Sequence, residues 1–351
     1  MTFRFNPLTL KKLQRFRSIK RGYYSFLILA FLYLITFYGI ADLLVNNRAL
    51  LVKYEGQLRF PTYGSMIPGT EFGEDYTYET NYRELKERFA REDSDSWVLM
   101  PPVPYSPYEN DFRDGLEHPI KPSLKLRHFL GTDNTGRDIF ARLFYGFQTG
   151  MTFALLFMLF VYLIGIAIGC AMGFFGGSFD LIVQRLIEIW SNIPFLYIVI
   201  IVASIIRPTM WILLGIMVLF SWTGMTYYMR TSTYRERERD YAAAARTLGA
   251  STPRIIFHHI LPNTISTIVT FMPFTIAGAI TSLTALDFLG FGLPPPTPSW
   301  GELLKRGLDQ LQAPWIVTSA FGGLVLVLIL VTFIGEAIRE AFDPKKFTTY
   351  Q

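Results

Sequence analysis

The sequence contains a single cysteine, Cys170, and six long stretches without any Asp, Glu, Lys or Arg. One cysteine cannot form a disulfide within the chain, so cysteine usage does not indicate a compartment. Each stretch has about 18 residues or more, and a helix of about 20 residues crosses the hydrocarbon core of a membrane. The predicted membrane helices are Gly22–Ala41, Leu143–Phe179, Ile189–Ile206, Pro208–Met229, Ile260–Leu286 and Ala313–Gly335. The sequence therefore predicts an all-α, polytopic membrane protein.

Several catalytic and energy-coupling features are also missing. The chain has no G-x-x-x-x-G-K-[ST] loop, which argues against an ATP site of its own. It also lacks the H-E-x-x-H pair, or a buried serine with a catalytic histidine, that would suggest an intramembrane protease. The ionisable residues close to the predicted spans all lie near span ends: Asp42, Glu188, Arg207, Asp287 and Glu336. Because an ion-coupled carrier ordinarily needs a buried charged site, uphill transport by this chain requires another source of energy.

The first apolar stretch has two interpretations. Gly39-Ile40-Ala41 loosely resembles a signal-peptidase site, but the basic lead-in and the apolar stretch are both longer than in a usual signal peptide. An uncleaved signal anchor is therefore favoured over a cleaved signal peptide. The net charge of +5 requires no nucleic-acid partner, because the basic clusters flank membrane spans.

Three basic clusters predict the orientation, since Lys and Arg favour the cytoplasmic side of short loops. Their members are Arg4, Lys11, Lys12, Arg15, Arg17, Lys20 and Arg21; Arg230, Arg235, Arg237, Arg239, Arg246 and Arg254; and Arg339, Lys345 and Lys346. Six crossings place all three clusters, and both termini, in the cytoplasm. The predicted parts are a cytoplasmic N-terminus (1–21), a first membrane helix (22–45), a periplasmic segment (46–148), a core with five membrane helices and a cytoplasmic loop at 230–262 (149–337), and a cytoplasmic tail (338–351).

The periplasmic segment is mixed in charge and contains one clear helix signal. Asn81 can cap a helix on which Tyr82, Leu85 and Phe89 share one face. The proline-rich stretch Pro101–Tyr108 cannot continue a helix. These features predict a small, mostly irregular cap, and a solvated linker is an equally good alternative.

Glycine and proline spacing indicates how the membrane helices pack. Gly165, Gly169 and Gly173 lie on one face of the second span, where glycines let helices approach closely in a bilayer. That face either packs within this subunit, which is favoured, or forms a seam with a partner or a wall of a pathway. Pro194 in the third span and Pro273 in the fifth each remove a backbone donor, which suits a kink or hinge.

The stretch Tyr234–Asn263 is polar, basic and rich in alanine, unlike its neighbours. It predicts two short helices parallel to the membrane. The first covers about 233–248 and ends at Gly249, which has no Cβ and readily adopts positive φ. The second begins with Thr252 as its N-cap and ends at Pro262.

The small side chains of Ala242–Ala245 at the end of the first helix can seat in a groove of another protein. The alternative is a basic amphipathic stretch that lies on anionic lipid. His258 and His259 point about 100° apart on a helix and have no Cys or carboxylate close by, so a structural or lipid-contacting role is favoured over a metal site.

Residues 243–263, AAARTLGASTPRIIFHHILPN, resemble the loop E-A-A-x3-G-x9-I-x-L-P shared by inner-membrane subunits of bacterial ATP-binding-cassette (ABC) importers. The positions Ala244, Ala245, Gly249, Leu261 and Pro262 match, whereas Ala243 replaces the glutamate and His259 the isoleucine. The missing carboxylate argues against a specific acid contact at that position.

Three further segments narrow the resemblance. Two of them are similar to the oligopeptide and dipeptide branch of that family. They are Leu130–Gly146 (LGTDNTGRDIFARLFYG) and Asp287–Leu304 (DFLGFGLPPPTPSWGELL). Ala41–Tyr63, followed by the long loop, is similar to Yej-type subunits, which belong to importers associated with peptides and with the peptide-nucleotide antibiotic microcin C.

The resemblance implies a type I ABC importer permease fold and a division of labour among subunits. A periplasmic peptide-binding protein delivers substrate to a heterodimer of this chain and a homologous permease. Two cytoplasmic ATPase domains, fused or separate, bind ATP-Mg and drive transport, while this chain binds no cofactor. The positions implied to contact the ATPase are Asp240, Tyr241, Ala242, Ala243, Ala244, Ala245, Arg246, Gly249, Ala250, Ser251, Leu261 and Pro262.

The segments on either side of the core suggest the entrance to the pathway. We expect residues 130–146 to form an interfacial helix capped by Asp133, and the proline-rich loop after the fifth span to be irregular but stiff. Both segments, with the long cap, are expected to contact the binding protein and line the entrance. The residues expected to do so are Gly131, Asp133, Arg137, Asp138, Gly290, Gly292, Pro296 and Trp300. Passive packing around the entrance is an equally good alternative for them.

The sequence thus predicts a permease subunit of an ATP-driven peptide importer in the bacterial inner membrane, without enzymatic activity of its own. The alternative is a non-pumping channel or scaffold subunit. Co-purification of a nucleotide-binding subunit would separate these two functions.

Overall fold

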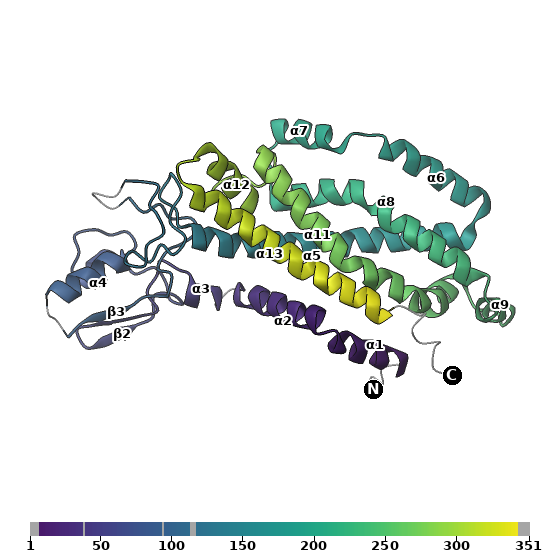
Figure 1. Ribbon diagram of the computed structural model, residues 1–351, viewed down its shortest axis with the longest axis horizontal. Helices are drawn as coiled ribbons and strands as arrows, with labels where there is room; N and C mark the ends of the chain where they lie inside the picture. Colours follow the sequence, from purple (N-terminus) through teal and green to yellow (C-terminus); the bar gives the residue numbers. More distant parts are fainter. Residues whose placement is uncertain (1–6, 38, 93–94, 113–116, 343–351) are drawn as a thin grey trace.

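The chain is described by a computed structural model that covers residues 7–37, 39–92, 95–112 and 117–342. A bundle of helices runs along the long axis, and a small mixed α/β unit lies at one end of it (Figure 1). The bundle consists of α1 (Pro7–Ser18), α2 (Lys20–Ile35), α3 (Ala41–Leu44), α5 (Ile139–Phe175), α6 (Gly177–Ser191), α7 (Phe195–Ile205), α8 (Met210–Arg237), α9 (Asp240–Thr247), α10 (Thr252–Arg254), the π-helical segment Ile255–Ile260, α11 (Leu261–Leu289), α12 (Trp300–Asp309) and α13 (Pro314–Phe342). Arg4 lies outside the described ranges, as do the last nine residues of the predicted tail, which include Lys345 and Lys346.

Four helical segments are long and apolar enough to cross a membrane. They are Ile139–Phe175, Met210–Arg237, Thr252–Leu289 and Pro314–Phe342. Two bent pairs also pass this test: Leu10–Ser18 with Lys20–Ile35, bent by 94°, and Gly177–Ser191 with Phe195–Ile205, bent by 63°. The described part of the chain therefore has four candidate spans, or six if each bent pair is one span.

The third predicted span, Ile189–Ile206, is not a single helix. The chain breaks between α6 and α7, and Pro194 is the N-cap residue of α7 at φ −69° and ψ 107°. The residue before a proline avoids helical geometry, which explains why α6 ends just before this point. Pro273, in contrast, lies buried inside the continuous helix α11.

The prediction of an interfacial helix at residues 130–146 is also wrong. Residues up to Asp138 form a loop, and Ile139 begins α5, a single helix of 37 residues. The predicted boundary at residue 148 therefore falls inside α5. A charged residue near the start of an apolar helix suggests a separate amphipathic segment, but Arg142 is completely buried by its partners instead of facing solvent.

The glycine stripe packs α5 against α8. A Cβ at Gly165 would lie 2.9 Å from the Trp222 carbonyl oxygen, and one at Gly173 would lie 2.6 Å from the Arg230 carbonyl oxygen. Such distances require glycine at the contact. The interpretation as packing within this subunit agrees with the structure, since all three glycines lie against α8.

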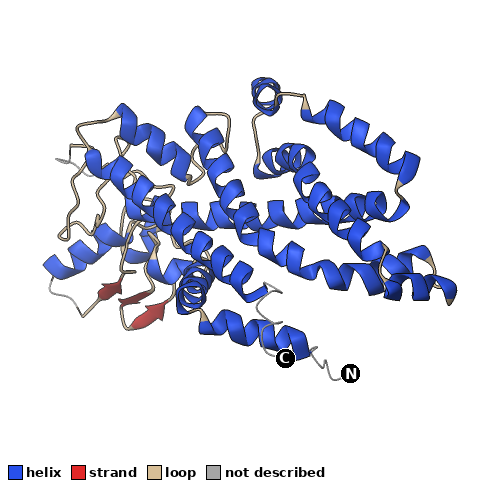
Figure 2. Ribbon diagram, turned by 45° about the vertical axis from the view of Figure 1, so that its right-hand side comes forward, coloured by secondary structure: helices blue, strands red, loops and turns tan. Residues whose placement is uncertain are grey.

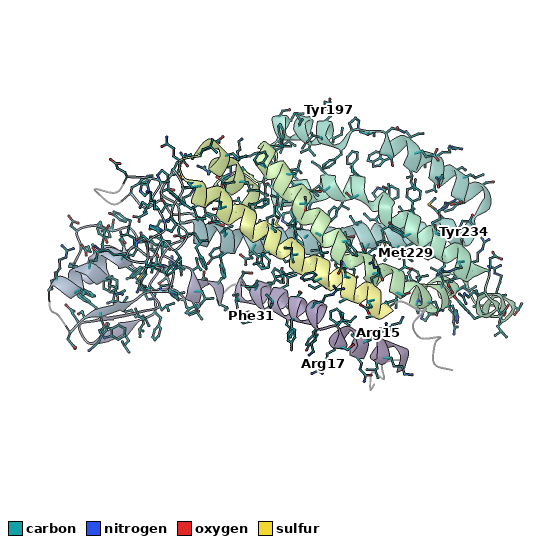
Figure 3. All side chains as sticks on the ribbon, in the orientation of Figure 1. Arg15, Arg17, Phe31, Tyr197, Met229 and Tyr234 are labelled. Atoms are coloured by element: carbon teal, nitrogen blue, oxygen red, sulfur yellow. The ribbon has the colours of Figure 1, made fainter. Side chains whose placement is uncertain are left out.

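Apolar side chains also point outward from the bundle. Figure 3 shows Phe31 on α2 and Tyr197 on α7 at its periphery, and their exposed fractions are 63% and 67%. Met229 on α8, in contrast, is fully buried. An apolar periphery is what a helical bundle presents to lipid or to a partner helix.

We call the segment 46–138 the cap, and its described residues have a hydrophobic core of their own. A three-stranded sheet in the order β2–β1–β3 is shown in red in Figure 2, with both pairings antiparallel. Its elements are β1 (Leu51–Tyr54), β2 (Gln57–Arg59), the 3-10 helix Gly69–Phe72, α4 (Tyr82–Arg91) and β3 (Trp97–Leu99).

The predicted helix start in the cap is confirmed. The Asn81 side chain accepts hydrogen bonds from the backbone N–H groups of Arg83 and Glu84. Tyr82, Leu85 and Phe89 are buried on one face of α4, where they pack with Val52 and Val98 of the sheet. The described part of the cap is therefore not a solvated linker, and the prediction that it is small and mostly irregular agrees with the structure, since its helices and strands are few and short.

We predict that Gly169→Ala destabilises the chain by about 1–3 kcal/mol through overpacking of the α5–α8 contact. The added Cβ would lie 2.5 Å from the Thr226 carbonyl oxygen and 2.7 Å from the Met229 Cβ. Gly150→Ala in the same helix is the control, because no atom lies within 4 Å of a Cβ there. Thermal unfolding of the purified variants measures the difference, and equal midpoints would contradict the prediction.

Candidate functional site

Two polar regions lie at opposite ends of the bundle (Figure 1). One comprises α9 and the turn after it, residues Asp240–Ser251, which we call the foot. The other is a group of buried charged residues where the cap meets α5 and α12, which we call the cap-side network. Most predicted site residues lie in these two regions or at the α5–α8 contact. The others are Pro194 at the start of α7 and Leu261, Pro262 and Pro273 in α11.

The foot is held at a fixed angle by the buried carboxylate of Glu236. This side chain is 6% exposed and accepts a hydrogen bond from the Tyr241 hydroxyl at 2.9 Å. Arg239 lies 3.1 Å from the same carboxylate. Glu236 belongs to α8, whereas Arg239 and Tyr241 follow the end of that helix, so these contacts bridge the break at which α8 ends at Arg237 and α9 begins at Asp240. The prediction of one helix from 233 to 248 is therefore wrong.

The two faces of α9 differ sharply. Ala242 and Ala245 are buried against the bundle, whereas Ala243 and Ala244 are exposed. Leu248, at the tip, is 87% exposed, the largest exposed fraction among the exposed large hydrophobic side chains of the described residues. The foot thus presents a surface of small side chains with one large apolar side chain.

Gly249 ends α9 as predicted. Its φ of +78° lies in the left-handed region that favours glycine, and no atom lies within 4 Å of a Cβ built there. The Ala250 N–H donates to the Ala245 carbonyl and the Gly249 N–H to the Arg246 carbonyl, both at 3.0 Å. This bonding is typical of a glycine-terminated helix end.

The second predicted helix of the loop is not a separate element. Ser251, not Thr252, is the N-cap residue of α10, and the chain continues through Ile255–Ile260 into α11 without a stop at Pro262. A proline inside a helix crowds the preceding turn. The wide π-helical turn directly before Leu261-Pro262 accommodates it. His258 is exposed and His259 half-buried on that turn.

Glu302 is the centre of the cap-side network. Its carboxylate bonds to three guanidinium groups, those of Arg137 (3.0 Å), Arg142 and Arg306. Burial alone would raise the pKa of Glu302, but Arg142 and Arg137 outweigh this effect and hold the pKa below its usual value. The carboxylate is therefore ionised and fully paired.

Arg142 connects four segments of the chain. It is 0% exposed and bonds to Glu302 on α12. Its other bonds go to the carbonyls of Pro107 in the cap (3.0 Å) and of Pro296 (3.2 Å) and Thr297 (3.3 Å) in the loop after α11. A buried guanidinium with this many fixed acceptors makes the junction of cap and bundle rigid.

Asp133 organises a turn and does not cap α5. Its Oδ1 accepts hydrogen bonds from the backbone N–H groups of Thr135 (2.9 Å) and Arg137 (3.0 Å), and its Oδ2 pairs with the Arg137 guanidinium at 2.7 Å. Burial tends to raise the pKa of Asp133, but Arg137 overcomes this and lowers the pKa. Asp138 is the N-cap of α5, accepting from the Ala141 N–H at 2.7 Å.

His128 lies between two carboxylates and is completely buried. Its Nδ1 is 2.7 Å from Asp138 Oδ2 and its Nε2 is 3.1 Å from Asp111 Oδ2, while its ring stacks on Tyr105 at 3.9 Å. Burial lowers the pKa of His128, but the hydrogen bonds to Asp111 and Asp138 outweigh it and raise the pKa above its ordinary value. An imidazolium here joins the cap to the start of α5.

Most residues predicted to contact a binding protein are buried within the chain. Gly290 and Pro296 are exposed, whereas Gly131, Asp133, Arg137, Asp138, Gly292 and Trp300 are buried. The Trp300 indole donates to the Leu143 carbonyl at 3.0 Å, and a Cβ at Gly292 would lie 1.8 Å from Asp287 Oδ1. These six residues shape the end of the bundle and offer no free contact surface.

Sequence reasoning missed the partners that complete both regions. The central residues of the cap-side network are Arg142, Glu302 and His128, and Glu236 holds the foot in place. One signal was available for Arg142, namely a charge at the start of an otherwise apolar run. No pattern marked His128, since its partners are 10 and 17 residues away on different segments. In the described ranges, no three His, Cys, Asp or Glu side chains are placed to hold a metal ion.

We predict that the stability conferred by His128 falls as the pH rises. Because its pKa in the fold exceeds the ordinary value of 6.5, the stabilisation is fully present below about pH 6.5 and is lost as the pH passes the raised pKa. His128→Gln is expected to remove that pH dependence and to cost about 3 kcal/mol or more, as breaking a buried ion pair does. Unfolding midpoints between about pH 6 and pH 9 measure both effects. His258→Gln, at an exposed position, should keep the wild-type profile; the same profile in His128→Gln would refute the assignment.

Comparison with known proteins agrees with this arrangement. Residues 165–348 match the family described as "Binding-protein-dependent transport system inner membrane component". The "Peptidoglycan transport system permease protein YejE" of Agrobacterium fabrum is 38% identical over 368 residues, covering 97% of this chain and 94% of the relative. The "Inner membrane ABC transporter permease protein YejE" of Escherichia coli is 39% identical over 345 residues, covering 98% and 99%.

A third relative matches a smaller share of the chain. The "Oligopeptide transport system permease protein OppC" of Lactococcus lactis subsp. cremoris is 36% identical over 229 residues, covering 64% of this chain and 78% of the relative. The resemblance noted in the sequence is thereby confirmed, both for the core and for the Yej-type N-terminal part. The chain belongs to the family of inner-membrane components of binding-protein-dependent ABC transport systems.

Proposed function

We propose that this chain is a permease subunit of an ATP-driven importer of peptides and forms the transport path with a homologous second subunit. The observation that carries the proposal is similarity along nearly the whole chain, cap included, to two relatives named as YejE permeases. The match to an oligopeptide permease supports peptides as the substrate class. Peptide-nucleotide compounds of the microcin C kind are included in the proposal through the Yej-type resemblance.

The proposed topology has six spans, with each bent helix pair as one span. Both termini and the foot lie in the cytoplasm, and the cap lies in the periplasm of a bacterial cell. Two groups of arginines support this orientation, because basic residues favour the cytoplasmic side. They are Arg15 and Arg17 near the N-terminus, and Arg235, Arg237 and Arg239 near the foot.

The foot is the proposed contact with the ATPase. Its exposed alanines and Leu248 can seat in a groove of a partner without the conformational cost of long side chains. ATP-Mg binds the partner ATPase domains in this proposal, and the chain has no phosphate-binding loop of its own. Because coupling is a difference in free energy between states, the ATPase must bind the foot more tightly in one state of the permease than in the other.

An open pocket of the bundle is the proposed contribution of this subunit to the path. It has a volume of about 370 Å³ and lies among α5, α8 and α11. Its lining combines aromatic side chains such as Tyr162 and Tyr228 with the hydroxyls of Ser221, Thr275 and Ser282. Hydroxyl and aromatic groups without charge can contact a peptide backbone and varied side chains without selecting one sequence.

Reconstitution tests the proposed function. We expect the permease pair, the ATPase and the binding protein in proteoliposomes to take up a defined labelled peptide only with hydrolysable ATP. A non-hydrolysable ATP analogue is the control. Uphill uptake without the ATPase, or a passive flux equal with and without ATP, would favour a channel or scaffold and contradict the proposal.

The foot can be tested separately. Leu248→Asp is expected to weaken ATPase binding about tenfold or more, because a desolvated apolar contact would be replaced by a charge. Leu311→Asp is the matched control, since Leu311 is 76% exposed and belongs to the loop between α12 and α13. Co-purification of the ATPase and peptide-stimulated ATP hydrolysis measure the effect. Equal ATPase retention in both variants would refute docking at the foot.

A further inference from the structure

The cap contains a basic cavity to which the proposed function assigns no role. It has a volume of about 350 Å³ and lies between α4 and the turn before His128. Four cationic side chains line it: Arg83, Lys86, Lys125 and Arg127. Across the cap as a whole, acidic residues outnumber basic ones, so this concentration of positive charge is local.

Among the described residues of the chain, three of the four cations have no counterion. Arg83 pairs with Glu109 at 2.5 Å. Within the described residues, Lys86, Lys125 and Arg127 form no ion pair, and Arg127 bonds to the Pro101 carbonyl at 3.2 Å. Glu87 is the single carboxylate in the lining, so the cavity keeps an excess of positive charge.

Burial and a neighbouring cation both act on Lys86. Burial lowers the pKa of Lys86, and the nearby charge of Arg127 lowers it further. Arg83 adds a second sign of an incomplete site, since its side chain is 10% exposed and its buried Nε has no hydrogen-bond partner. An anion in the cavity would relieve the repulsion.

The turn that carries Lys125 and Arg127 is held rigidly. Its ends are joined by the hydrogen bond from the Ser123 N–H to the His128 carbonyl at 2.8 Å, and His128 is anchored between two carboxylates. Between these fixed ends, Leu124 is 81% exposed. A stiff turn with cations and a protruding apolar side chain side by side suits a protein surface better than a free small anion.

We propose that this cavity receives a carboxylate side chain of the periplasmic binding protein, with Leu124 as the adjacent apolar contact. The inference rests on the proposed function, because it names the place where the delivering protein docks. The site would steer the acidic surface of that protein toward the cap and set its orientation above the path. Steering by exposed charges acts mainly on the association rate and weakens with salt.

The test uses the complete transporter in nanodiscs and measures association of the binding protein. In the double variant K86E/K125E we expect association at least about tenfold slower at low salt, with a flatter dependence on ionic strength. Lys121→Glu is the matched control, because Lys121 is an exposed lysine of the same segment that does not line the cavity. Leu124→Ala should raise the dissociation rate with little effect on association.

Three results of these measurements would contradict the proposal. Equal rates for K86E/K125E and wild type, or equal losses in K121E, would show that the cavity is not the docking site. An effect seen only in nanodiscs with anionic lipid would identify a lipid headgroup as the occupant. ATP-dependent peptide uptake by the wild-type complex is measured in parallel, so failure of this inference is distinguishable from failure of the proposed function.

Discussion

The shared carboxylate of Glu302 is the interaction on which the junction of cap and bundle depends. Burying an ion costs several kcal/mol unless partners compensate for the lost water. Here three guanidinium groups surround one carboxylate, and Arg142 extends the contact to backbone carbonyls of the cap and of the loop after α11. Since removal of one partner would leave buried charges unpaired, the cap, α5 and α12 behave as one unit.

The interior of the bundle, in contrast to its junction with the cap, is held together by close packing and not by buried charges. Between α5 and α8, glycines bring the backbones together, and the Thr226 carbonyl oxygen lies where a Cβ of Gly169 would need space. Near the end of α8, Arg230 forms two hydrogen bonds of 2.5 Å with Asp180. The Arg185–Glu188 pair lies on the exposed surface of α6 and not in the interior of the bundle. A charge is expensive in the bilayer core, so this division is expected for a membrane protein.

The sequence predicted those features that depend on local chemistry. Charge-free runs identified the apolar helices, Asn81 identified the start of α4, and Gly249 identified the end of α9. It failed where distant residues decide the local structure. The start of α5 is determined by Asp138 and its contact with His128, and the end of α8 by Glu236 and Tyr241. Helix propensity favoured one helix through Glu236–Asp240, but burial of Ala242 and Ala245 requires a change of direction there.

Rigidity at both ends of α5 limits how the proposed importer can move. This helix has 37 residues and a length of about 55 Å at 1.5 Å per residue, with Asp138 in the cap-side network at its start. At its other end, the Phe174 carbonyl accepts a hydrogen bond from Arg237 at 3.0 Å, and the Phe174 ring lies 5.6 Å from the Arg246 guanidinium on α9. A force on the foot therefore reaches α5 and α8 together and moves the cap with them. The change of shape must then occur where elements are not locked in this way, and the 63° break between α6 and α7 at Pro194 is such a place.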